Sequence, residues 1–215
     1  MKKILTFLMI FVALVTFFAC DTGNSSSGNG GNGSNSENVT VNPDSIAEEF
    51  KECATTVNPS ELSITDGNWT VIGIQTDTGR IQSLTLQATV KDDYFTYTSG
   101  TEAYIVDVSI MFEEEPELLD ALRNAKNDEE KTAIMIELQG EMPEGATLTW
   151  DGLIGTMTYP LNQEDLEDYS EDIQFSSLPE FAVVKCNADK TKYVISITYE
   201  RDESEVTETY YIEKN

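Results

Sequence analysis

An apolar–polar alternation with a period of two recurs from residue 69 onward and restricts the chain to a fold based on β-sheet. The clearest run places Leu84, Leu86, Ala88 and Val90 at every second position, with Thr or Gln between them. In a strand, such a run puts the apolar side chains on one face and leaves the other face wet. The pattern therefore predicts antiparallel strands, each with one solvated face.

Short turn sequences separate these runs. Asp77–Arg80 is a typical turn, and Asp151-Gly152 between two alternating runs is one of the stronger hairpin signals. Strands joined in this way form meanders and hairpins. We expect about nine strands, at residues 69–75, 84–90, 94–98, 103–112, 146–150, 153–159, 181–186, 193–199 and 206–212.

Helices are expected in three places. Ser45-Ile46-Ala47-Glu48 has the spacing of a capping box and begins an amphipathic stretch, which predicts a helix over residues 45–57 with Cys53 on its buried side. Residues 116–139 form a central helical segment, either one helix or two separated near residue 127, and the acidic residues 162–172 form a short helix. The predicted fold class is α+β, mainly antiparallel β-sheet, with an N-terminal helix and a central helical segment.

The first 43 residues differ from the rest of the chain. Lys2 and Lys3 precede an apolar run that ends at Phe18, and this run is shorter than the ~20 residues of a membrane-spanning helix. This predicts a signal peptide over residues 1–19. A Gly, Ser and Asn tract follows Cys20 and predicts a flexible tether over residues 20–43, which leaves residues 44–215 as a single globular domain.

Phe17-Phe18-Ala19-Cys20 resembles the lipobox of bacterial lipoproteins, in the loose form that spirochaete lipoproteins have. The resemblance covers residues 1–20 only. It implies that the signal is cleaved before Cys20, that lipid is attached to this cysteine, and that acyl chains hold the protein at a bacterial membrane. The implied location is the cell envelope, either periplasmic or surface-exposed.

A second, local resemblance concerns Gly67-Asn68-Trp69, which is similar to the G-x-W motif of lipocalins. It implies an alternative fold, a lipocalin-like β-barrel that carries a small apolar ligand, with Arg201 as the only candidate to pack against Trp69. The other interpretation is a core Trp at the start of a strand. The helical segment at residues 116–139 interrupts the strands where lipocalins have no such insertion.

The charge of the chain limits its partners. The sequence has 13 Lys and Arg against 39 Asp and Glu, a net charge of −26. Nucleic acid is excluded as a partner because its binding depends on basic side chains that neutralise phosphates. Contact with the membrane must come from the acylated Cys20, and the domain itself is expected to bind a protein or a glycan.

Neither catalysis nor a cofactor is expected. The sequence has no His, which removes His-dependent nucleophiles and His-ligated zinc. The acidic runs 113–117 and 164–168 lack the glycine and spacing of a calcium loop, so no metal site is predicted. The expected function is a non-enzymatic binding or interaction module, and the alternative is the lipocalin-like carrier.

Cys53 and Cys186 remain as a pair once Cys20 is assigned to lipid. In an exported domain they form either one disulfide or two buried free thiols. A bridge between positions so distant in sequence would stabilise the domain by roughly 4–5 kcal/mol in the loop-entropy model.

Overall fold

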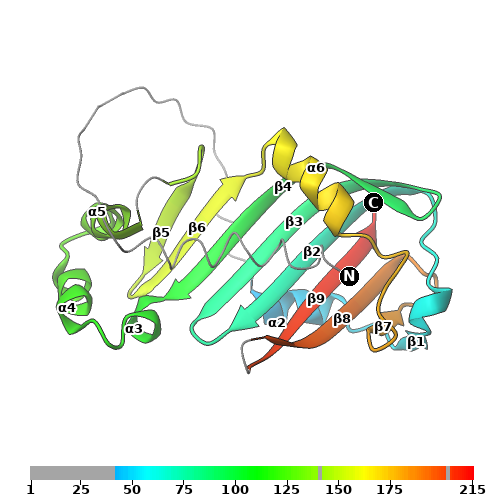
Figure 1. Ribbon diagram of the computed structural model, residues 1–215, viewed down its shortest axis with the longest axis horizontal. Helices are drawn as coiled ribbons and strands as arrows, with labels where there is room; N and C mark the ends of the chain where they lie inside the picture. The colour runs from blue at the N-terminus through cyan, green and yellow to red at the C-terminus, as the bar shows by residue number, and fades with distance from the viewer. Residues whose placement is uncertain (1–41, 140–141, 202–203) are drawn as a thin grey trace. The chain divides into compact units, whose positions relative to one another are not determined.

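The computed structural model describes residues 42–139, 142–201 and 204–215, which belong to one compact unit (Figure 1). The predicted signal peptide and Cys20 lie outside the described residues, as does the predicted tether except for Asn42 and Pro43, which begin α2. Nine strands are present: β1 Thr55–Val57, β2 Gly67–Asp77, β3 Arg80–Lys91, β4 Tyr94–Asp107, β5 Thr147–Asp151, β6 Ile154–Pro160, β7 Val183–Cys186, β8 Lys192–Arg201 and β9 Ser204–Lys214. The helices of the described part are α2 Pro43–Glu49, α3 Val108–Met111, α4 Pro116–Asn124, α5 Asp128–Gln139 and α6 Gln163–Asp172, with a 3-10 turn, η1, at Pro59–Glu61.

The strands form one antiparallel sheet in the order β1-β7-β8-β9-β2-β3-β4-β6-β5. β1 and β5 are its two edges, so the sheet is open and does not close into a barrel. The α+β prediction is confirmed, and the alternative of a lipocalin-like barrel is wrong. Trp69 is fully buried in the core of this open sheet, where its indole N–H donates to the Thr65 carbonyl at 2.9 Å.

The predicted helix over residues 45–57 is too long. The Asn42 side chain accepts hydrogen bonds from the backbone at the start of α2, and the helix ends at Glu49. The β-branched residues Thr55, Thr56 and Val57 then form β1, which pairs with β7. Residues of this type favour strands, and the pairing with β7 outweighs the helical periodicity.

The expected strands at 94–98 and 103–112 implied a turn between them, at Ser99-Gly100. This turn is absent, because residues 94–107 form the single strand β4. The register between β4 and β3 shifts at Gln87/Ala88, which indicates a β-bulge. A side chain at Gly100 would meet Leu86 at 2.6 Å and Leu161 at 2.8 Å. The glycine therefore serves a close approach of neighbouring side chains.

Helices replace the end of the predicted 103–112 strand and divide the central segment. Asp107 caps the short helix α3, where its carboxylate accepts from the Ser109 amide at 2.9 Å. Residues 116–139 form the two helices α4 and α5, the second of the two arrangements left open by the sequence. The acidic helix expected at 162–172 is confirmed as α6.

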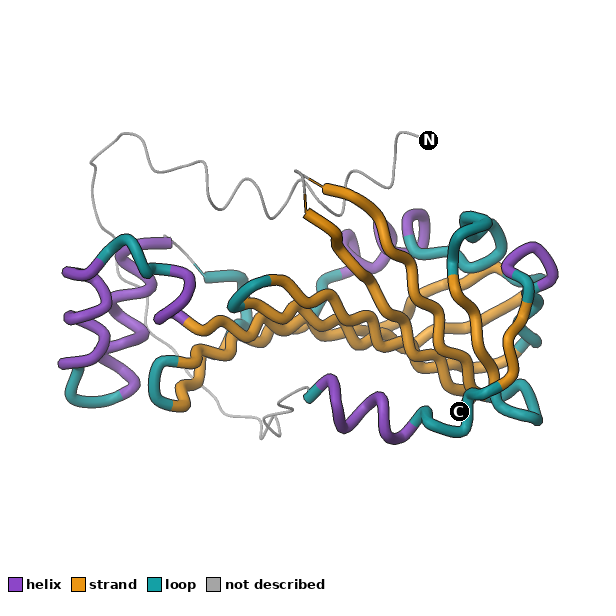
Figure 2. Tube along the Cα trace, turned by 90° about the horizontal axis from the view of Figure 1, so that it is seen from below, coloured by secondary structure: helices purple, strands orange, loops and turns teal. Residues whose placement is uncertain are grey.

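One face of the sheet, here named the front face, carries Trp69, Leu86 and Tyr193 and packs against helices. In Figure 1, α6 crosses this face, whereas α2 lies behind the sheet. Figure 2 gives the edge-on view, with α3, α4 and α5 grouped at the end formed by β5 and β6. Val108, Leu122 and Met135 are buried there, with Trp150 packed against them. Among the described residues, no helix combines the length and apolarity needed to span a bilayer.

Candidate functional site

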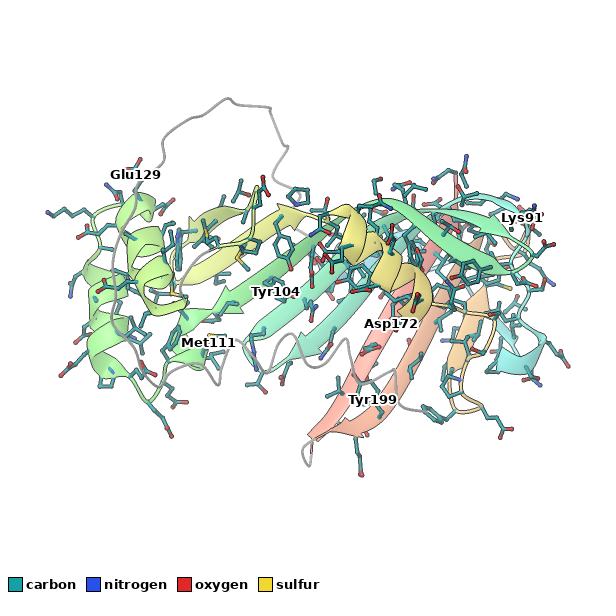
Figure 3. All side chains as sticks on the ribbon, turned by 45° about the horizontal axis from the view of Figure 1, so that its top comes forward. Lys91, Tyr104, Met111, Glu129, Asp172 and Tyr199 are labelled. Carbon is teal, nitrogen blue, oxygen red and sulfur yellow. The ribbon has the colours of Figure 1, made fainter. Side chains whose placement is uncertain are left out.

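A row of polar side chains crosses the front face between its two apolar parts. Glu208 of β9, Gln75 of β2, Gln82 of β3 and Tyr104 of β4 are successive cross-strand partners. We name these four residues the polar strip. Four adjacent strands spaced by about 4.8 Å give it a length of roughly 14 Å. Figure 3 labels Tyr104 and Tyr199, which lie near its two ends.

Glu102 is the centre of a hydrogen-bond network at the β4 end of the strip. Its side chain is only 4% exposed. One carboxylate oxygen accepts from the Tyr104 hydroxyl at 2.5 Å and from the Gln82 amide at 2.6 Å. The other oxygen accepts from the Tyr159 hydroxyl at 2.6 Å and from the Tyr169 hydroxyl at 3.3 Å. The ion pairs formed between described residues do not include Glu102, so neutral donors satisfy this acid.

The phenols of this network hold their protons strongly. Burial, followed by the nearby Glu102 carboxylate, raises the pKa of Tyr104, Tyr159 and Tyr169 far above the usual value of a tyrosine. Each phenol is therefore a stable donor over the whole physiological pH range. The Tyr104 and Tyr159 rings are nearly parallel, with an interplanar angle of 16° and a centroid distance of 6.3 Å.

Three strands and one helix bring the donors together. Glu102 and Tyr104 are two residues apart on β4 and share the front face, and the register places Tyr159 of β6 opposite Glu102. Tyr169 comes from α6, whose start is fixed by a capping box between Asn162 and Asp165.

Helix α6 also binds the first part of β4. There β4 pairs with β3 on one side only, because β6 pairs with residues 101–107 alone. There the Tyr97 amide donates to the Ser170 hydroxyl of α6 at 3.0 Å, and the Phe95 amide donates to the side chain of Gln174, just after the helix, at 2.9 Å. These contacts satisfy strand amides that would otherwise be open, and they fix Tyr169 above Glu102.

A second acid occupies the other end of the strip. Glu208 is half-buried and accepts from the Tyr199 hydroxyl at 2.6 Å and the Tyr210 hydroxyl at 3.1 Å. Burial, then the Glu208 carboxylate, raises the pKa of Tyr210 well above the usual value. The two ends of the strip therefore have the same chemistry, a carboxylate held by phenols.

The centre of the strip offers open hydrogen-bonding groups. Gln75 is half-buried, and its side chain makes no hydrogen bond with another described residue. Gln82 donates its amide hydrogens to Glu102 and Tyr104, which leaves its amide oxygen without a donor among the described residues. In the next row of the front face, Arg80 forms an ion pair with Asp77 at 3.6 Å.

This arrangement is suited to binding through hydrogen bonds and ring contacts. Two carboxamides supply donors and acceptors together, and phenol rings at both ends supply flat apolar surface with a polar tip. Within the described ranges, no group of three or more acids or thiols could hold a metal ion.

The cysteines singled out in the sequence lie elsewhere. Cys53 and Cys186 are both buried and free, at the edge of the sheet where β1 pairs with β7. Burial raises the pKa of the Cys53 thiol, with smaller contributions from Glu52 and Cys186. The disulfide stays a prediction. Cys20 lies outside the described residues, as does the side chain of Arg201.

The residues of the polar strip and its network were not foreseen from the sequence. A usable signal was present, because Gln82 continues the apolar alternation of Leu84 and Leu86 with a polar residue. Glu208 does the same between Val206 and Tyr210. A polar residue at an apolar-face position marks a place where the core is interrupted.

Known proteins give no further guide to this site: no protein-family model matches the chain, and no curated protein or solved structure matches it significantly.

Proposed function

We propose that the protein is an exported lipoprotein, held at a membrane of the cell envelope by acylated Cys20, whose domain is a non-enzymatic binding module. The polar strip is its binding surface. The lipobox-like residues 17–20 and the Gly, Ser and Asn tract after them support the anchorage. The tether would let the domain stand clear of the lipid headgroups.

The observation that carries the binding role is the burial of Glu102 without a basic partner. Removing a carboxylate from water is costly unless its oxygens are fully hydrogen-bonded. Gln82, Tyr104, Tyr159 and Tyr169 supply these bonds from β3, β4, β6 and α6. An apolar side chain would serve stability more simply at this position, and departures of this kind from core packing concentrate at functional sites.

The network also makes the strip rigid. Binding sites gain affinity when a second layer of hydrogen bonds fixes the groups that meet the ligand. Glu102 fixes Gln82 and three phenols, so the strip is ordered before a ligand arrives. The lipocalin-like carrier required a closed barrel around an apolar cavity; because the sheet is open and helices pack on its apolar face, we do not retain that function.

Anchorage is tested by Cys20→Ser in the full chain expressed in a bacterial host. The wild type is expected in the membrane fraction and labelled by a radioactive fatty acid, whereas the variant loses the label and is uncleaved or leaves the membrane. Ser25→Ala, in the tether, is the matched control and should behave as wild type. Unchanged labelling and size in Cys20→Ser would contradict the anchor.

Binding at the strip is tested by thermal shift, since a ligand that binds only the folded state raises Tm. The full chain in detergent is screened against amino acids, polyamines, nucleosides, fatty acids and saccharides, as wild type and as Gln75→Leu. Gln87→Leu is the control, because it makes the same substitution on the neighbouring strand β3 but on the opposite face of the sheet. A compound that raises Tm in the wild type and the control, and not in Gln75→Leu, supports the proposal. If no shift depends on Gln75, the strip is not the binding surface.

A further inference from the structure

We infer that the ligand of the polar strip is a neutral saccharide; this inference rests on the proposed use of the strip as a binding surface. The strip contains two carboxamides in adjacent strands, Gln75 and Gln82, whose open groups include donors and acceptors. A sugar hydroxyl both donates and accepts, so neighbouring hydroxyls can satisfy neighbouring carboxamides in both directions.

An anionic ligand is disfavoured by the charge around the strip. Helix α6 contains six acids and no basic residue in its ten positions, and it crosses the front face beside Glu102. The chain as a whole carries a net charge of −26. Arg80, the basic side chain in the row next to the strip, is already paired with Asp77. A phosphate or carboxylate would therefore meet repulsion, and none of the described side chains beside the strip offers an open cation to bind it.

A cationic ligand is disfavoured for a different reason. Each oxygen of Glu102 already accepts two hydrogen bonds, and the side chain is buried. Both oxygens of Glu208 accept from tyrosines as well. At Glu102 an ammonium or guanidinium group would have to displace phenols that hold their protons. Glu208 accepts one hydrogen bond on each oxygen and keeps lone pairs open, so spermine tests this end of the strip.

The rings favour a ligand with flat C–H faces. The half-buried Tyr159 lies at one end, nearly parallel to the buried ring of Tyr104, and the half-buried Tyr199 lies at the other, next to Glu208. Tyrosine offers a rigid amphipathic ring whose face contacts apolar atoms while its hydroxyl remains hydrogen-bonded. A pyranose combines apolar C–H faces with an equatorial belt of hydroxyls, so it matches both the rings and the carboxamides. A purely apolar ligand would leave the carboxamides unsatisfied.

The test is a glycan array probed with the full chain in detergent, followed by calorimetry with each neutral oligosaccharide that is retained. Spermine and heparin are included as cationic and anionic probes. Gln75→Leu is expected to weaken saccharide binding by about tenfold, because one carboxamide's hydrogen bonds are lost. Gln87→Leu should bind as wild type does.

The outcomes separate this inference from the function on which it rests. Saccharide binding that is lost in Gln75→Leu and kept in Gln87→Leu supports both. If no neutral saccharide binds, the inference is overturned; a Gln75-dependent response to spermine, heparin or another compound would then leave the strip as the binding surface. Saccharide binding that is equal in the two variants places the site elsewhere and overturns both.

Discussion

The two acids at the ends of the polar strip, Glu102 and Glu208, both accept hydrogen bonds from phenols, but they differ in burial and in the number of these bonds. Glu102 is buried on a central strand and accepts four hydrogen bonds from four elements. Glu208 is half-buried and accepts two, from Tyr199 on the neighbouring strand and from Tyr210 two residues along its own strand. The number of protein donors rises as access to water falls, because a buried carboxylate must obtain from the protein the bonds that water no longer supplies.

This difference in hydrogen bonding indicates that the two ends of the strip have different structural roles. The Glu102 network joins α6 to three strands, so it holds the fold as well as the strip. The Glu208 cluster involves only the β8–β9 hairpin, so it orients side chains without fastening a separate element. We therefore expect changes at Glu102 to act mainly on stability, and changes at the centre of the strip to act mainly on binding.

The largest expected effect is that of Glu102→Ala, which leaves three phenols and one amide without their acceptor. Unsatisfied buried donors cost about 1–3 kcal/mol each when water cannot reach them. Four such donors cost at least about 4 kcal/mol together. We expect the free energy of unfolding to fall by about 4 kcal/mol, measured by urea denaturation of the full chain. Glu208→Ala, the matched change at the half-buried acid, should cost about 1 kcal/mol. Equal losses would contradict the difference between the two ends.

The second-largest expected effect is a loss of folding stability at alkaline pH, caused by the tyrosines around Glu102. The unfolded-state pKa of tyrosine is about 10, and burial together with Glu102 raises the folded-state pKa of Tyr104, Tyr159 and Tyr169. Between these values the folded state binds more protons than the unfolded state, so stability is complete below about pH 10 and falls as pH rises above it.

The measurement is urea denaturation across this pH range, with tyrosinate absorbance followed in parallel. Ionisation of the buried phenols should coincide with unfolding. Glu102→Ala removes one of the causes that raise these pKa values, so its stability should fall less steeply with pH. Glu208→Ala removes one cause of the raised pKa of Tyr210 alone, so its slope should lie between those of the wild type and Glu102→Ala, which affects three phenols. A stability that stays level above pH 10 would refute the role given to burial.

Removing a single phenol hydroxyl should lower the free energy of unfolding by less than removing an acid does. The loss should again be larger at the Glu102 end than at the Glu208 end. Tyr159→Phe deletes a 2.6 Å bond to the buried acid, and Tyr210→Phe deletes a 3.1 Å bond to the half-buried one. We expect a cost of about 1.5 kcal/mol for the first and about 0.5 kcal/mol for the second, by denaturant midpoints at neutral pH. The reverse order would show that burial is not what makes the Glu102 network strong.

The sequence predicts the sheet well because strand periodicity is a local property. It fails where a distant partner decides the outcome. Residues 55–57 become a strand because β7 lies beside them. Residues 94–107 remain one strand because a bulge and Gly100 absorb the irregularity that resembles a turn. The total of nine strands is reached because these two differences compensate each other.

The site was less accessible to sequence reasoning, for a related reason. Glu102 lies outside every expected strand and beside an expected turn, so nothing local marks it as buried. Its donors come from positions up to 67 residues away, and only the sheet register and α6 bring them together. Alternation could have identified Gln82 and Glu208 as polar residues on an apolar face, but it could not have joined them into one strip.

The smallest expected effect on stability is that of Gln75→Leu. This variant tests most directly whether the centre of the strip is separate from the network that supports the fold. Gln75 lies between the two acids, is a cross-strand partner of both Gln82 and Glu208, and makes no side-chain hydrogen bond within the described part of the chain. No buried donor or acceptor loses its partner when the carboxamide is removed, so the free energy of unfolding should change by less than about 0.5 kcal/mol. Gln82→Leu, one strand away, takes a donor from Glu102 and should cost about 1.5 kcal/mol. Urea denaturation of the two variants side by side measures this difference. A loss at Gln75 as large as that at Gln82 would mean that the centre of the strip is part of the supporting network, which would remove the reason to regard it as open to a ligand.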